Sequence, residues 1–255
     1  MIALASNNFG PDGGAPLFDG RRNSEEDREV SAEKISRPGA GRRATSFSRG
    51  QDYLRKVDPV IGRLVEQRPD FDPLAWLDEL PPMDLFGSLL FQVAGQQLSV
   101  AATRRIVGRV TSLFGDHMPS PDQLLAVDAN DLRAAGLSWR KVNTLRDLAE
   151  RFVDGRLDVE RLRGMSDDQF IVELTAVPGI GPWTAQGALL VALRREDIVL
   201  PGDLALRKAI RDAYHLDHLP SQEEVLEIAE KWRPFRSLAT SYLFATAYES
   251  DQPGP

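Results

Sequence analysis

The chain of 255 residues contains no cysteine. This absence excludes disulfide bonds, thiolate zinc sites, thiolate-ligated iron–sulfur clusters and cysteine nucleophiles, and it favours a reducing compartment. No apolar run reaches the roughly 18 residues that a membrane span needs, and the first residues lack the basic start and apolar core of a secretory signal. We therefore expect a cytoplasmic protein, nucleoid-associated if it is bacterial, that is neither secreted nor bound to a membrane.

An excess of basic residues is also missing, since the formal net charge is -7. Proteins that bind nucleic acids usually carry a basic footprint. The argument is weak, because a compact site can bind DNA through backbone N–H groups and a few arginines while the far surface is acidic. The only histidines are His117, His215 and His218, and without cysteine they favour zinc very little.

The alternation of apolar and polar residues that marks strands is absent, and only residues 197–200 look extended. Helical signals take its place. Residues 83–95 are apolar nearly all round and predict a buried helix. N-caps, capping boxes and terminal glycines predict further helices at residues 99–115, 119–127, 128–136, 138–155, 166–177, 182–190, 221–232 and 236–249, and one beginning at 203. We predict an all-α fold of nine or ten helices joined by short loops.

Residues 1–50 differ from the rest of the chain, because they are polar, rich in Gly, Arg and Ser, and show no helical stripe. We predict a disordered tail over residues 1–50 and a helical domain over residues 51–255. The tail is either a floppy terminus or a basic arm that helps to hold nucleic acid.

The stretch LTAVPGIGPWTAQGALL, residues 174–190, places a tight glycine turn between two helices. Gly179 and Gly181 permit positive φ and expose backbone N–H groups, and Pro182 suits the first position of a helix. The N-terminus of that second helix directs free N–H groups and a partial positive charge outward, which suits a phosphate. We expect Ile180 to anchor the turn in the core. In the alternative, the glycines only allow a sharp turn.

Asp203 then stands at the start of the next helix, where an N-cap is its plainest role. The order of helix, glycine hairpin, helix, loop and Asp resembles the helix-hairpin-helix DNA glycosylases that have a Gly/Pro-rich loop and a catalytic Asp (HhH-GPD). Five blocks, in order, resemble the 3-methyladenine DNA glycosylase II family: GQQLSVAATRRIVGRV, LRAAGLSWRKVNTLRDLA, VPGIGPWTAQGALL, VLPGDLALRKAI and WRPFRSLATSYLF.

This resemblance covers about residues 85–248. It implies a two-lobed helical fold with a DNA-binding cleft between the lobes and a hairpin at about residues 166–193. Some members carry an α/β domain before the helical core. No strand-rich segment precedes residue 80 here, so the resemblance is to the short form.

The resemblance implies a monofunctional DNA glycosylase of base excision repair. Such an enzyme flips alkylated purines such as 3-methyladenine and 7-methylguanine out of duplex DNA and hydrolyses the N-glycosidic bond, which leaves an abasic site. Asp203 would stabilise the oxocarbenium-like transition state and orient or deprotonate water; Asp197 is its nearest competitor. Members with lyase activity carry a Schiff-base Lys where this chain has Trp183, and Lys208 lies on the wrong element.

The same resemblance matches Trp183 and Phe244 to aromatic residues of the base pocket, with Tyr242 and Trp139 as weaker candidates. Cationic alkylpurines stack well on electron-rich rings. Core packing is the alternative for each ring.

By the same resemblance, the segment Gln96, Gln97 and Leu98 occupies the position of the family's wedge, which is the side chain that fills the gap left in the duplex by the flipped base. Gln97 matches best, because it can also hydrogen-bond to the orphaned base, whereas Leu98 could only fill the gap. Alternatively, Gln97 is a solvated loop residue.

The resemblance also assigns phosphate contacts to the backbone N–H groups of Gly179, Gly181 and Thr184. A structural Na⁺ or K⁺ would bind to the backbone carbonyls of Thr175, Val177 and Ile180, and no other cofactor is implied. Arg236 matches a position near the site, although it could simply pair with an acid of the fold.

Two other kinds of function compete with the enzyme. The first is a non-enzymatic helix-hairpin-helix DNA-binding protein, and the second is a helical protein-interaction domain without salt-dependent DNA affinity. The combination of Asp203, Trp183 and Phe244 favours the enzyme, because a pure binding protein does not need all three. We expect a monomer whose partner is double-stranded DNA with alkylated bases.

Overall fold

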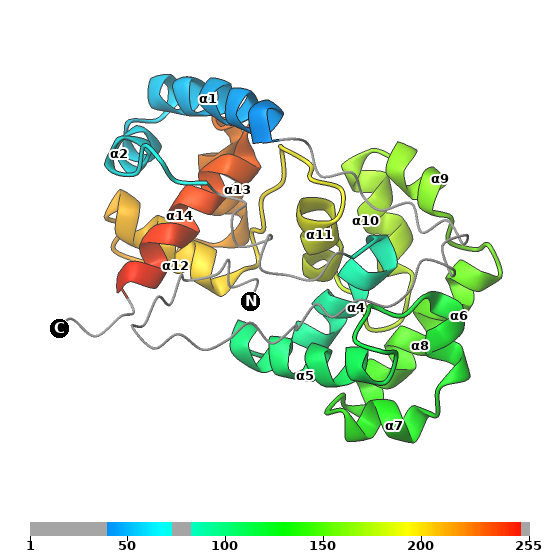
Figure 1. The fold of residues 1–255 in the computed structure, drawn as a ribbon. Coiled ribbons are helices and arrows are strands. Elements are labelled where there is room, and N and C mark those ends of the chain that lie inside the picture. Colours follow the sequence, from blue (N-terminus) through cyan, green and yellow to red (C-terminus); the bar gives the residue numbers. More distant parts are fainter. Residues whose placement is uncertain (1–39, 73–82, 251–255) are drawn as a thin grey trace.

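The computed structural model describes residues 40–72 and 83–250. These residues form thirteen helices and no strand (Figure 1), which confirms the all-α prediction. None of the described helices is both long enough and apolar enough to cross a membrane.

The helices form two lobes (Figure 1). The first lobe is the continuous middle of the chain and contains α4 (Leu85–Gly95), α5 (Val100–Ser112), α6 (Pro121–Ala126), α7 (Ala129–Ala134), α8 (Trp139–Val153), α9 (Val159–Gly164), α10 (Asp167–Thr175) and α11 (Pro182–Val191). The second lobe combines the first and the last of the described helices, namely α1 (Ala40–Val57), α2 (Pro59–Gln67), α12 (Leu204–Tyr214), α13 (Gln222–Glu230) and α14 (Arg236–Ser250).

Helix α4 is the centre of the first lobe and contacts α5, α8 and α11. All of its residues except Phe91 are buried, as the apolar run over residues 83–95 predicted. Such a helix has no solvent face, so neighbours must cover it on every side. Its C-terminal end, at Gly95, leads into the loop that connects α4 to α5.

Capping residues in the sequence correctly predicted where most of the helices begin. Ser99 and Ser138 accept hydrogen bonds from first-turn N–H groups of α5 and α8. Complete capping boxes begin α10 at Ser166 and α13 at Ser221. These caps satisfy N–H groups that have no partner within the helix, which is why short polar residues precede each helix.

The structure differs from the prediction at α1, α2 and α9, which had not been assigned as helices. Helix α1 begins at Ala40, ten residues before the predicted end of the tail at Gly50. Gly50 is buried so closely that a Cβ atom there would lie 2.7 Å from Leu238 Cδ2 of α14. Packing against α14 thus stabilises a segment whose composition resembles a tail. Residues 1–39 lie outside the described residues, and residues 197–200 form no strand.

Asp58 joins the parts of the second lobe. Its Oδ1 atom caps α2 by accepting hydrogen bonds from the N–H groups of residues 60 and 61. Its Oδ2 atom accepts from the Trp232 indole at 2.7 Å, from Lys231 Nζ at 3.1 Å and from the Tyr214 hydroxyl. Burial alone would raise the pKa of this carboxyl, but the bonds from Tyr214, Trp232 and Lys231 hold the pKa below its ordinary value.

Candidate active site

The glycine turn between α10 and α11 is fixed by one glycine rather than by both. Gly179 has φ of +91°, and a Cβ atom there would lie 2.0 Å from Thr144 Oγ1 of α8. That hydroxyl donates to the carbonyl oxygen of Pro178 at 3.0 Å. Gly181 was also expected to permit positive φ, but its φ is −100°. Ile180 is 5% exposed, so the tip of the turn is anchored in the core as predicted.

Helix α11 lacks the side-chain cap that other helices have. Ser or Asp side chains accept first-turn N–H groups at the starts of α2, α4 to α10, α12 and α13. Helix α11 begins instead at Gly181, and no side chain caps it. Its first-turn N–H groups and the positive end of its dipole are therefore available to an external anion.

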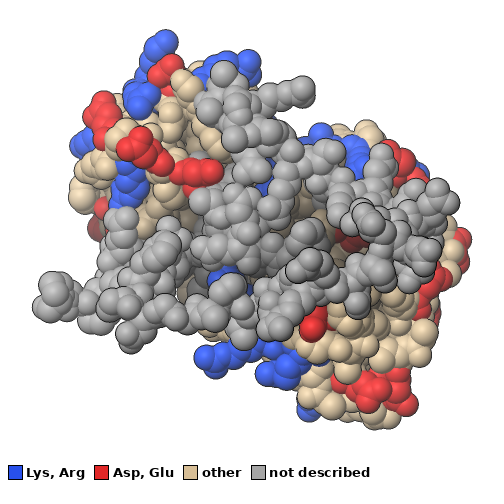
Figure 2. Space-filling view, in the orientation of Figure 1, with Lys and Arg blue, Asp and Glu red and all other residues tan. Residues whose placement is uncertain are grey.

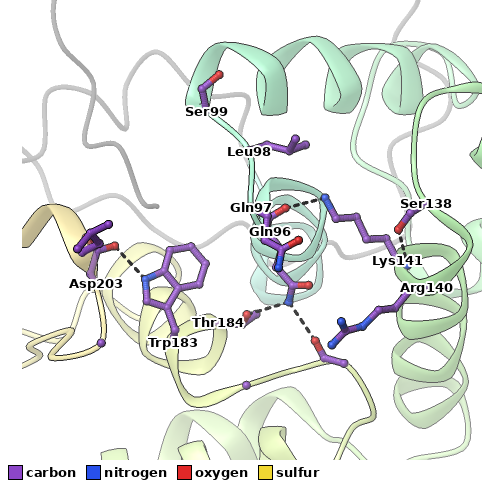
Figure 3. A pocket seen from close by; sticks show the side chains of 14 residues that line it. Gln96, Gln97, Leu98, Ser99, Ser138, Arg140, Lys141, Trp183, Thr184 and Asp203 are labelled. Carbon is purple, nitrogen blue, oxygen red and sulfur yellow. Dashed lines mark hydrogen bonds between the residues drawn. The ribbon is translucent and has the colours of Figure 1, made fainter. Parts of the chain in front are cut away.

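Asp203 begins α12 and is only 3% exposed. Its Oδ1 atom accepts the backbone N–H groups of Ala205 at 2.9 Å and Leu206 at 3.1 Å. Its Oδ2 atom accepts the indole N–H of Trp183 at 3.0 Å (Figure 3). Asp203 can therefore be both an N-cap and a residue of the site, because Oδ1 caps α12 and Oδ2 contacts Trp183.

The loop from α4 to α5, called the wedge loop after the role predicted for residues 96–98, faces this carboxylate across the site (Figure 3). The Gln96 side chain turns toward the hairpin and donates to Gly179 O at 3.0 Å and Thr184 Oγ1 at 3.1 Å. Gln97 is exposed and has φ of +60°, a conformation that non-glycine residues rarely adopt. Leu98 is half-buried. Of the three predicted wedge residues, Gln97 is the one whose side chain is free to leave the protein surface.

Lys141 of α8 holds the same loop from its other side. Its ammonium donates to Ala94 O at 2.8 Å and to Gln96 O at 2.9 Å. Burial lowers the pKa of Lys141 below its ordinary value. Because these two carbonyls lie at the end of α4, the lysine replaces helical partners that the chain no longer provides.

These elements enclose a pocket of about 800 Å³ between the lobes. The first lobe contributes the wedge loop, the start of α8 and the hairpin, and the second contributes the start of α12. The described lining contains eight predicted site residues, six further residues and no histidine. The predicted residues are Gln96, Gln97, Leu98, Gly179, Gly181, Trp183, Thr184 and Asp203, and the residues that were not predicted from the sequence are Ser99, Ser138, Arg140, Lys141, Gly202 and Leu204.

Two predicted pocket aromatics lie elsewhere. Tyr242 and Phe244 of α14 are completely buried and do not line this pocket. Tyr242 packs against Phe71 and accepts a hydrogen bond from Gln51 Nε2 at 2.7 Å. The structure therefore places both rings in the core of the second lobe. Trp139, the weaker candidate, is 49% exposed and lies beside the pocket-lining Ser138 and Arg140.

Asp197 and Arg236 bind each other. Arg236 Nε and Asp197 Oδ1 are 2.7 Å apart, and Arg233 contacts the second carboxylate oxygen at 2.6 Å. This pairing ties the start of α14 to the loop after α11. Among the described residues that line the pocket, Asp203 is the acid, since Asp197 is not one of them.

A signal for Arg140 and Lys141 was present in the sequence. Cations in the first turn of a helix oppose the helix dipole, yet both stand in the first turn of α8, two and three residues after the N-cap Ser138. Such a placement suggests a reason outside the helix. For Lys141 the reason is the wedge loop, and Arg140 is exposed on the pocket lining.

The distribution of charge modifies the argument from net charge. Basic side chains gather over the region of α5 (Figure 2). This helix contains Arg104, Arg105 and Arg109 and no acidic residue. A locally basic surface beside the pocket is therefore compatible with the acidic total.

Residues 92–234 match the model of the HhH-GPD superfamily base excision DNA repair proteins, and the match spans the wedge loop, the hairpin and Asp203. The chain belongs to this superfamily. A DNA-3-methyladenine glycosylase of Schizosaccharomyces pombe is 30% identical over 213 residues, which are 83% of this chain and 92% of that protein. The DNA-3-methyladenine glycosylase 2 of Escherichia coli is 28% identical over 74% of this chain and 65% of its own length. These matches place the HhH-GPD chain in the 3-methyladenine DNA glycosylase family.

Solved structures support the same placement. The S. pombe 3-methyladenine DNA glycosylase in complex with abasic DNA superimposes with a TM-score of 0.72 at 29% identity, over 81% of this chain and all of that one. An 8-oxoguanine glycosylase/lyase of Clostridium acetobutylicum has a TM-score of 0.67 at 19% identity, over 81% of this chain and 71% of its own. At that identity the second likeness supports the two-lobed fold alone.

Proposed function

We propose that this HhH-GPD chain is a monofunctional 3-methyladenine DNA glycosylase. It binds duplex DNA, flips an alkylated purine such as 3-methyladenine or 7-methylguanine into the pocket, and hydrolyses the N-glycosidic bond. The observation that carries the proposal is the carboxylate of Asp203, which is buried and yet lines the pocket between the lobes.

Asp203 supplies the chemistry. Cleavage of the N-glycosidic bond leaves positive charge on the sugar, and an alkylated purine departs as a neutral base. A carboxylate that is already fixed beside the sugar stabilises this charge without reorganising. It can also orient the attacking water and take its proton.

Trp183 and Gln97 have different roles in base flipping. The Trp183 ring forms a wall of the pocket and stacks on the cationic purine. Gln97, exposed on its strained loop, fills the gap that the purine leaves in the duplex. Phe244 and Tyr242 have no part in this account because they are buried in the core.

The hairpin holds the DNA backbone. Phosphate oxygens accept the backbone N–H groups of Gly179, Gly181 and Thr184, at the end of a helix that no side chain caps. The carbonyls of Thr175, Val177 and Ile180 lie at the end of α10 and in the turn. Backbone carbonyl oxygens can replace the hydration shell of such a monovalent cation, Na⁺ or K⁺, although Val177 O also accepts the N–H of Ile180 at 3.0 Å. A cation held there would only add positive charge beside the phosphate.

Strand cleavage is not part of the proposed reaction. Trp183 has no amine with which to form a Schiff base. The lysine that lines the pocket, Lys141, is already bound to two backbone carbonyls of the wedge loop. The product is therefore an intact strand with an abasic site. Because its substrate is chromosomal DNA, the enzyme would act at the chromosome, which lies in the cytoplasm if the organism is a bacterium.

The direct test is to incubate the protein with methylated duplex DNA and to separate the released bases by chromatography. The proposal predicts free 3-methyladenine or 7-methylguanine above the rate without enzyme, strands that break only after alkali, and no covalent complex with borohydride. A protein that bound the DNA but released no base from a wide panel of lesions would instead be a non-enzymatic DNA-binding protein.

A further inference from the structure

We propose that Trp183 is a positioning residue for Asp203, and that its indole N–H serves this role separately from the stacking of its ring. The inference rests on the proposed function, because it assigns a second task to a residue of the same site. Its basis is the 3.0 Å hydrogen bond from Trp183 Nε1 to Asp203 Oδ2.

The hydrogen bonds of Asp203 show why this donor matters. A carboxylate offers about four acceptor positions, two on each oxygen. The N–H groups of Ala205 and Leu206 occupy both positions of Oδ1. Trp183 occupies one position of Oδ2 and leaves one for water or the sugar. Rotation of the carboxylate about its Cβ–Cγ bond would break these contacts, so the three donors together fix where the remaining lone pair lies.

A second Asp in the same chain provides an internal comparison. Asp58 also begins a helix, also accepts two helix N–H groups with Oδ1, and also accepts a Trp indole with Oδ2. There, Lys231 and the Tyr214 hydroxyl add two more donors to Oδ2, and Asp58 is completely buried. Asp58 therefore accepts five donors and is structural, whereas Asp203 accepts three and keeps room for a further donor on the Oδ2 atom.

The bond also joins two elements of different lobes. Trp183 lies in the first turn of α11, between Gly181 and Thr184 of the hairpin, whereas Asp203 begins α12. Gln96 binds Thr184 and Gly179 from the wedge loop. The hydrogen bond from Trp183 thus connects the hairpin that would hold the phosphate to the carboxylate of Asp203. It thereby sets the distance between the DNA backbone and the catalytic group.

The test replaces Trp183 with 3-benzothienylalanine, in which sulfur takes the place of the N–H group while the fused ring keeps its size. Single-turnover release of 3-methyladenine and the dissociation constant for the DNA are measured for the protein and this variant. We expect the rate constant to fall about 10- to 100-fold, the range for a lost hydrogen bond to a charged group, with an unchanged dissociation constant. The matched control makes the same replacement at Trp232, which should lower thermal stability and leave the rate unchanged.

Two results would overturn the inference. One is an unchanged rate constant in the Trp183 variant, which would mean that the ring alone matters. The other is a loss confined to DNA affinity. Trp183→Phe gives a second reading, because it should lose at least as much rate as the sulfur analogue. Failure of the original protein to release any base is a different outcome, since it refutes the proposed function itself.

Discussion

Gly179→Ala tests how the hairpin is held. The backbone at this position has φ of +91°, and the new Cβ atom would lie 2.0 Å from Thr144 Oγ1. An L-residue in the left-handed region costs about 1–2 kcal/mol. The contact also forces the Thr144 hydroxyl away from Pro178 O, which loses a hydrogen bond of about 0.5–1.5 kcal/mol. The free energy of unfolding should therefore fall by roughly 1.5–3.5 kcal/mol.

Urea unfolding measures this change, and a double-mutant cycle separates its two causes. In a Thr144→Ala background the hydroxyl is already gone and the remaining Cβ atom lies 3.1 Å from the new one, so Gly179→Ala should cost little more than the backbone penalty of about 1–2 kcal/mol. Gly181→Ala is the matched control. Its φ is −100° and nothing lies within 4 Å of the new Cβ atom, so its cost should stay below about 1 kcal/mol.

Equal costs of Gly179→Ala in both backgrounds would refute the assigned contact with Thr144. A cost below about 0.5 kcal/mol, within the range of ordinary surface substitutions, would refute the strained turn altogether.

Three further perturbations address the pocket and the fold. Gln97→Ala should leave stability unchanged but reduce base flipping, seen as a smaller rise in 2-aminopurine fluorescence on binding; an unchanged rise would remove Gln97 as the wedge. Arg140→Gln should weaken DNA binding and reduce the slope of log affinity against log salt by about one, whereas Arg156→Gln, beyond the far end of α8, should not. Asp58→Asn tests how the stability of the fold depends on pH. Because folding lowers the pKa of Asp58, its carboxylate stabilises the fold above the pKa of the unfolded state, and this stabilisation is lost as the pH falls through the pKa of the folded state. The free energy of unfolding, measured with urea between neutral and acid pH, should therefore depend less steeply on pH in the variant.

The helix starts could be predicted because their causes are local. Ser99, Ser138 and Asp203 each accept N–H groups within three residues along the chain. Such contacts depend on spacing alone, so a sequence reader can find them. The buried helix before the wedge loop was equally clear, because apolar residues on every face leave no alternative.

The positions of aromatic side chains could not be predicted in the same way. Tyr242 lies in an apolar run, and such a run does not reveal whether a ring faces a pocket or the core. Its partner Gln51 is 191 residues away. Helix α1 was missed for a related reason, since its stability comes from contacts with α14 that its own composition does not show.

The site itself combines both kinds of information. Asp203 and the hairpin were found from motifs. Three hydrogen bonds of the site join segments that lie between 20 and 88 residues apart in the sequence: those from Trp183 to Asp203, from Gln96 to the hairpin and from Lys141 to the wedge loop. Only the folded chain brings these partners together.

The most direct measurement of the central claim is single-turnover release of 3-methyladenine from methylated duplex DNA by the protein and by Asp203→Asn. Asn caps helices about as well as Asp, so the fold and DNA affinity should persist. The account predicts that the rate constant falls at least about 100-fold, as expected for a preorganised electrostatic group. A variant that binds the same DNA and releases the base at the original rate would contradict it.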